Sequence, residues 1–121
     1  MNAEEFKLRT RRYALRVVNL VQAMPTGAVG EVLGKQLLRS GTSVGANYRA
    51  ACRAKSRVDM LAKLGTVEEE ADETLYWLEM IIEAGLFPAA KLSDLCQEGE
   101  EILCMIVASR KTLRAALHSQ S

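Results

Sequence analysis

The sequence predicts an all-α fold, an antiparallel up-down-up-down four-helix bundle, and three observations support this prediction. Apolar residues recur every three or four positions through four segments, as they do in helices with one buried face. The two prolines, Pro25 and Pro88, lie at segment boundaries, so short loops would join the helices. Aromatic residues make up only 5% of the chain, and this composition favours helix over strand. The expected helices cover residues 4–24, 29–54, 57–84 and 88–117.

The length of 121 residues is that of one domain, which we expect to span residues 1–121. Its first helix, residues 4–24, has a core stripe that includes Phe6, Tyr13 and Val17. A second apolar face lies well round from this stripe, and two such faces are more than a lone small bundle needs. We therefore predict a subunit interface there, with a wide core contact as the alternative. The second face consists of Leu8, Leu15 and Val18.

Two interpretations compete for residues 29–54. A turn at Gly41-Thr42-Ser43 would divide them into the two short helices of a DNA-binding helix-turn-helix. One continuous helix is the other interpretation, although each interior glycine costs about 1 kcal/mol relative to alanine. The glycines recur in helical register, which turn glycines have no reason to do, so the pattern favours one helix with a close-packing face. That face holds Gly34, Gly41 and Gly45.

Basic residues gather in the first two helices. Residues 1–57 carry 11 basic and 3 acidic side chains, whereas residues 58–101 carry 2 basic and 12 acidic ones. Guanidinium groups match phosphate oxygens and release counterions on binding, so the basic face is the candidate site for nucleic acid or a partner. Alternatively, these side chains pair with acids of the third helix in the same or a neighbouring subunit. The candidates are Arg9, Arg12, Arg16, Lys35, Arg39, Arg49, Arg53 and Arg57.

The third helix, residues 57–84, is marked at both ends. Ser56 has the properties of an N-cap, and Asp59 three residues later can complete a capping box. Gly85 is a natural residue to follow the helix. Three large side chains lie off the core stripe, which predicts a second contact surface for self-association. They are Tyr76, Trp77 and Met80.

The fourth helix, residues 88–117, can accommodate Pro88 in its first turn. Acidic side chains come early in it and basic side chains come late, an order that complements the helix dipole. The acids are Asp94, Glu98, Glu100 and Glu101, and the bases are Arg110, Lys111 and Arg114.

The sequence contains no recognisable set of catalytic residues. His118 is the only histidine, so a histidine-based triad or zinc site is not expected, and Glu-x-x-His pairs and a phosphate-binding glycine loop are missing. We expect no metal and no cofactor. The three cysteines lack CxxC spacing and are expected to be reduced thiols. Apolar runs are far shorter than a membrane span, and no signal segment is evident, so we expect a cytoplasmic protein.

Three stretches of the chain, Gln36–Ser56, Lys63–Gly65 and Glu69–Glu79, closely resemble the 23S rRNA-intervening-sequence protein family. The resemblance implies an antiparallel four-helix bundle that assembles as a ring-like homopentamer. The family also includes accessory proteins of diversity-generating retroelements, which are basic pentamers that bind a reverse transcriptase and nucleic acid. The net charge of +1 departs from those strongly basic relatives, and the family offers no catalytic residues to carry over.

From these observations we expect a non-enzymatic oligomeric accessory protein. Its leading function is contact with RNA or a ribonucleoprotein partner through the arginines of the first two helices. The alternative is a protein-interaction scaffold whose charged faces serve assembly alone, with no binding of nucleic acid.

Overall fold

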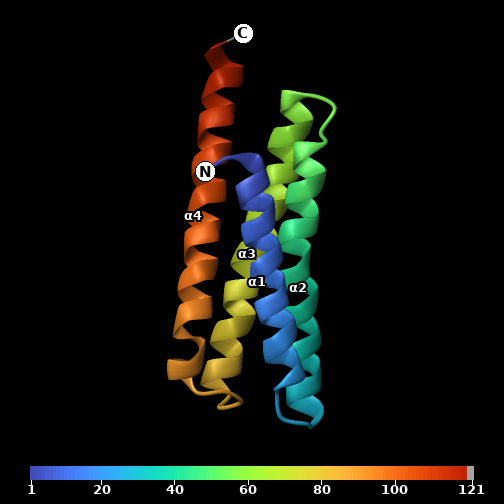
Figure 1. Ribbon diagram of the computed structural model, residues 1–121, viewed down its shortest axis with the longest axis vertical. Helices are drawn as coiled ribbons and strands as arrows, with labels where there is room; N and C mark the ends of the chain where they lie inside the picture. Colours follow the sequence, from blue (N-terminus) through green and yellow to red (C-terminus); the bar gives the residue numbers. More distant parts are fainter. Residues whose placement is uncertain (120–121) are drawn as a thin grey trace.

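A computed structural model describes residues 1–119 as four helices and no strand. Neighbouring helices run in opposite directions, as an up-down-up-down bundle requires (Figure 1). Each helix begins and ends within two residues of the range expected from the sequence. The all-α four-helix prediction is therefore confirmed. The helices are α1 (Ala3–Gln22), α2 (Ala28–Cys52), α3 (Arg57–Glu83) and α4 (Ala89–Ser119).

The boundaries of α3 follow from local hydrogen bonds. The Ser56 side chain accepts a hydrogen bond from Asp59 N at 3.0 Å, and Asp59 Oδ2 accepts one from Lys55 N at 3.1 Å. At the other end Gly85 has φ +73°, a conformation that glycine adopts without strain. The Leu86 N–H then bonds to Ile81 O at 3.0 Å, which closes a Schellman motif. Short-range chemistry therefore fixes both ends: Ser56 caps the helix as predicted, and Asp59 bonds to Lys55 N in place of the Ser56 N–H that a capping box uses.

Helix α2 continues through Gly41 without interruption, so the helix-turn-helix interpretation is wrong. Thr42 Oγ1 donates to Leu38 O at 2.7 Å, and Ser43 Oγ donates to Arg39 O at 2.6 Å. Both hydroxyls thus bond to carbonyls of their own helix instead of forming a turn. The packing of α1 against α2 explains why a glycine-containing helix persists here.

The contact between α1 and α2 is close at the glycines of α2. A Cβ added at Gly41 would lie 2.8 and 2.9 Å from the two Cγ atoms of Val17. At Gly45 it would lie 3.2 Å from Thr10 Oγ1, and at Gly34 it would be 3.5 Å from a methyl group of Val21. The absence of side chains at these positions lets the two helices approach each other.

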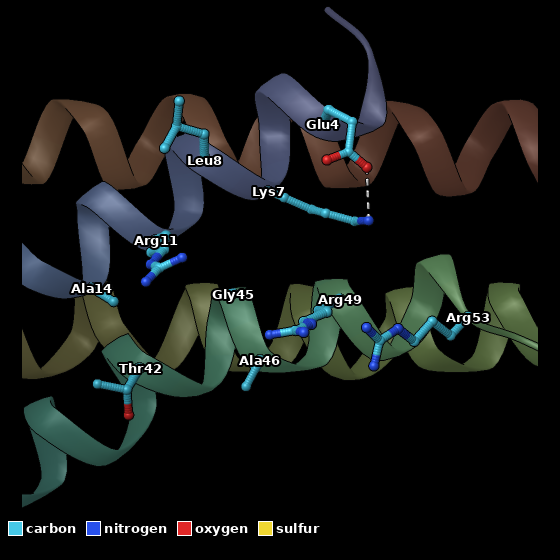
Figure 2. Close-up of a pocket in the computed structure, with 10 residues that line it drawn as sticks. All are labelled: Glu4, Lys7, Leu8, Arg11, Ala14, Thr42, Gly45, Ala46, Arg49 and Arg53. Carbon is cyan, nitrogen blue, oxygen red and sulfur yellow. Dashed lines mark hydrogen bonds and ion pairs between the residues drawn. The ribbon is translucent and has the colours of Figure 1, made fainter.

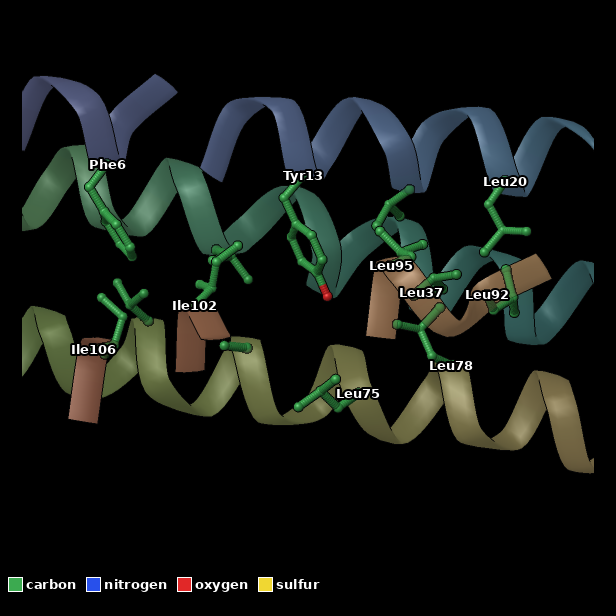
Figure 3. Close-up of a cluster of buried hydrophobic side chains, with 14 of the residues drawn as sticks. Phe6, Tyr13, Leu20, Leu37, Leu75, Leu78, Leu92, Leu95, Ile102 and Ile106 are labelled. Atoms are coloured by element: carbon green, nitrogen blue, oxygen red, sulfur yellow. The ribbon is translucent and has the colours of Figure 1, made fainter. Parts of the chain in front are cut away.

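The core runs along the bundle between the four helices (Figure 3). Tyr13 points from α1 into this interior, and its side chain is 1% exposed. Its hydroxyl makes no hydrogen bond with the described residues, and burial raises the pKa of the phenol. A Cβ at Gly99 of α4 would lie only 2.6 Å from this oxygen. Tyr13 and Gly99 therefore form a tight contact between α1 and α4.

None of the four helices, as far as the structure describes them, is long and apolar enough to cross a membrane.

Candidate nucleic-acid interface

A groove of about 600 Å³ runs between the exposed sides of α1 and α2 (Figure 2). Lys7 and Arg11 of α1 line one wall, and Arg49 of α2 and Arg53, the C-cap residue that follows α2, line the other. The members of each pair are four residues apart, a spacing that places Lys7 and Arg11 on the same face of α1. We call this the basic groove. The remaining lining residues are Glu4, Leu8, Ala14, Thr42, Gly45 and Ala46.

Positive charge in the basic groove is mostly uncompensated. Lys7 Nζ pairs with Glu4 at 3.0 Å. Arg11, Arg49 and Arg53 make no ion pair and no side-chain hydrogen bond with residues 1–119. With Glu4 counted, the lining has a net charge of +3, from four basic side chains and one acidic side chain. Three guanidinium groups with open donors can bind phosphate or carboxylate oxygens.

Arg49 and Arg53 are the members of the predicted basic face that line this groove. Lys7 and Arg11 were not among the predicted site residues, because on a helical wheel they lie on the opposite side of α1 from Arg9. The glycine face of α2 could have identified them. Because α1 packs against this face, one side of α1 must lie next to Arg49, and Lys7 and Arg11 are on that side.

Arg9 serves the contact between α1 and α4. Its Nε and one terminal nitrogen donate to the two carboxylate oxygens of Glu98 at 2.8 and 2.6 Å, and the same nitrogen reaches Glu101 at 3.0 Å. This bidentate pair is half-buried, with the Arg9 side chain 22% exposed. The Arg9 guanidinium holds the pKa of Glu98 below its usual value, although burial opposes the shift. Arg9 therefore has an acid partner within the chain.

Arg39 and Lys35 are also paired within the chain. Arg39 contacts Glu70 at 3.3 Å and makes a short ion pair with Glu73, both in α3. Lys35 lies 3.5 Å from Glu31 in its own helix. The alternative of pairing with acids of the third helix therefore describes Arg39, whereas Arg9 pairs with acids of α4 and Lys35 with an acid of α2.

The other candidates lie on two further surfaces. Arg12 and Arg16 line a groove of about 410 Å³ on the α4 side of α1, which also includes Glu98. Arg57 lines an apolar groove between α3 and α4, beside Met60. The eight candidates therefore do not form one continuous basic face.

The Arg9–Glu98 pair makes stability depend on pH in a defined direction. The pKa of Glu98 is lowered from its ordinary 4.5, so its contribution is present above this value and is lost as the pH falls through the lower folded pKa. We expect the melting temperature to fall less for Glu98→Gln than for the wild type between about pH 5 and pH 3. Glu100→Gln, an exposed neighbour without an ion pair in the described chain, is the matched control. Equal pH slopes for wild type and Glu98→Gln would contradict this assignment.

The predicted self-association residues lie on α1 and α3. Leu8 and Leu15 are 47% and 56% exposed, and Tyr76 is 51% exposed. Val18, Trp77 and Met80 are half-buried. The Tyr76 and Trp77 rings pack edge to face with centroids 5.0 Å apart, and Trp77 Nε1 donates to Glu73 at 3.2 Å. Apolar surface is thus accessible on two helices that do not pack against each other.

Metal-binding clusters of three or more histidine, cysteine, aspartate or glutamate side chains do not occur within residues 1–119. Across the same residues the three cysteines are free thiols, and Cys104 is exposed.

Comparison with known proteins identifies the family. The family model described as the 23S rRNA-intervening sequence protein matches residues 5–108. A solved structure of a protein with unknown function, from the S23 ribosomal protein family of Bacteroides thetaiotaomicron, matches with a TM-score of 0.81 and 36% sequence identity. The match covers 92% of this chain and 99% of that one. No curated protein matches the chain. The sequence-based resemblance is confirmed, and the chain belongs to the 23S rRNA-intervening sequence protein family.

Proposed function

We propose that this chain is a non-enzymatic accessory protein that binds RNA, alone or within a ribonucleoprotein, through the basic groove. One observation carries the proposal: three arginines without an acid partner in the described chain converge with Lys7 on one concave surface. Arginine forks bind phosphate oxygens bidentately, and neutralising phosphates releases condensed counterions. The lining also includes small residues, which leave room for a phosphate chain to reach all four cations. They are Ala14, Gly45 and Ala46.

Self-association is the second element of the proposal, and a ring-like homopentamer is the expected assembly. Its support is the exposed apolar surface at Leu8, Leu15 and Tyr76. A ring would bring several copies of the groove together, so that one RNA could contact more than one of them and bind with higher avidity. Light scattering at micromolar concentration tests this element, and the mass of a monomer would contradict it.

Gel-shift titration with a structured RNA tests the binding proposal. We expect the wild type to bind at 50 mM salt and Arg49→Glu/Arg53→Glu to bind at least about 30-fold more weakly, because two phosphate contacts become repulsive. Both side chains are exposed, so the fold should tolerate the change. Lys111→Glu/Arg114→Glu makes the same charge change on exposed residues of α4, away from the groove, and should remain within about threefold of the wild type. Equal losses for the two variants would contradict a site in the groove.

The alternative function is a protein scaffold that does not bind nucleic acid. The pairing of Arg9 and Arg39 with acids of neighbouring helices favours it, because the chain already uses arginine for assembly of its own bundle. In that case the basic groove would hold an acidic surface of another copy. No RNA binding at 50 mM salt, together with a smaller oligomer for Arg49→Glu/Arg53→Glu, would support the scaffold.

A further inference from the structure

We infer that the basic groove binds the sugar–phosphate backbone of an extended single strand of RNA and does not recognise its bases. This inference rests on the proposed function and specifies the class of nucleic acid that the groove takes. Three features of the groove lead to it: the spacing of the cations, the lack of an aromatic lining residue and the position of the groove between two packed helices.

The cations are spaced for successive phosphates. Lys7 and Arg11 of α1 are four residues apart, or about 6 Å along the helix axis, and Arg49 and the C-cap residue Arg53 have the same separation in sequence at the end of α2. This spacing is close to that between successive phosphates of an extended strand. Figure 2 shows the four side chains reaching toward the same groove from the two helices. A strand lying along it would therefore meet a cation from each wall at each of two phosphates.

The lining has no aromatic side chain on which a base could stack. Single-strand binding proteins that engage bases present aromatic side chains on which the bases stack. None of the ten residues that line the basic groove is aromatic, and the exposed Tyr76 lies on α3, outside this groove. The lining also includes the small residues Ala14, Gly45 and Ala46, which let a backbone come close but offer no platform for stacking. The bases would then point toward solvent.

The position of the groove between two packed helices favours one strand over two. Axes of packed helices are typically about 8–10 Å apart, a separation that suits a single backbone lying between α1 and α2. A duplex RNA is wider than one strand, so it would touch only the rim of the channel. It would consequently reach fewer of the four cations than a single strand does.

Glu4 competes with the strand for Lys7. It lies 3.0 Å from Lys7 Nζ, and its side chain is 83% exposed, so a phosphate could displace it. Replacement of Glu4 by glutamine removes this internal anion and leaves four cations for the strand. The variant should therefore bind a single strand more tightly than the wild type does.

Fluorescence anisotropy with three 12-nucleotide probes tests the inference: oligouridine, an abasic strand of the same length and a duplex RNA. We expect oligouridine and the abasic strand to bind within about threefold of each other and the duplex about tenfold more weakly. The slope of log K against log salt should be about −3 for the single strand, because each of four cations contributes about −0.7. Arg49→Ala/Arg53→Ala should reduce that slope by about 1.4, and Glu4→Gln should tighten binding about threefold.

Each contrary result has a separate meaning. A loss of more than about tenfold for the abasic strand would overturn backbone-only recognition, and equal binding of the duplex would overturn the single-strand preference. In both cases the proposed RNA binding would stand. No binding of any probe at 50 mM salt would overturn the proposed function itself. A smaller oligomer for Arg49→Ala/Arg53→Ala would identify the groove as a contact between copies and would overturn the inference.

Discussion

Replacing Gly99 by alanine is expected to lower the free energy of unfolding by about 3 kcal/mol, a large effect for the addition of one methyl group. The new Cβ would lie 2.6 Å from Tyr13 Oη and 2.9 Å from Leu75 Cδ2, so it would overlap both side chains. Tyr13 is fully buried and cannot swing into solvent without opening the contact between α1 and α4. Thermal or urea unfolding of Gly99→Ala measures the loss.

The cause of that loss can be isolated with Tyr13→Phe. The Tyr13 hydroxyl is buried and makes no hydrogen bond in the described chain, so its removal should leave stability unchanged or raise it by about 1 kcal/mol. It also removes the atom nearest to the added methyl group. Gly99→Ala should therefore cost about 1–2 kcal/mol less in the Tyr13→Phe background than in the wild type. Additive effects of the two substitutions would contradict the proposed overlap.

Gly41→Ala should lower the free energy of unfolding by about 2 kcal/mol, and the melting temperature by about 8 °C. The added Cβ would lie 2.8 Å and 2.9 Å from the two Cγ atoms of Val17, a branched side chain held in the core. Relief requires α1 to move away from α2, which would loosen contacts along both helices. This cost exceeds the gain of about 1 kcal/mol that alanine brings to a helix interior.

The matched control for Gly41 is another glycine of the same helix. At Gly34 the added Cβ would lie 3.5 Å from a Val21 methyl, an ordinary van der Waals distance, so helix propensity should decide the outcome. Gly34→Ala should therefore raise stability by up to about 1 kcal/mol. Val17→Ala should partly relieve Gly41→Ala, because it removes the two atoms that clash. Equal effects at both glycines would show that the close approach does not govern α2.

The net charge conceals how unevenly charge is distributed over the molecule. The chain as a whole carries only +1, yet the basic groove concentrates cations that no acid of residues 1–119 neutralises, except for Lys7. Local potential, more than total charge, governs the capture of an anionic chain. On the proposed function, this local charge would bind a phosphate backbone although the total charge is close to zero.

Much of the fold was predictable because local physics fixes it. The recurrence of apolar residues determines which face of each helix is buried, and capping chemistry determines where α3 begins and ends. Ser56, Asp59 and Gly85 act through neighbours a few residues away, so their roles can be derived from the order of residues alone. The spacing of the glycines likewise predicted that α2 is one helix. Gly34, Gly41 and Gly45 lie on one face only if the helix continues without a break between them.

The sequence by itself therefore determined four helices, their ends and the abundance of arginine in the first two. Only the tertiary structure decided which basic side chains are available. Arg9 and Arg39 resemble Arg49 in sequence context, but Glu98 of α4 and Glu73 of α3 come within ion-pairing distance of the first two, and no acid of the described chain approaches Arg49 in this way. Ion pairing depends on distances between helices far apart in the chain, and helical periodicity carries no information about those distances.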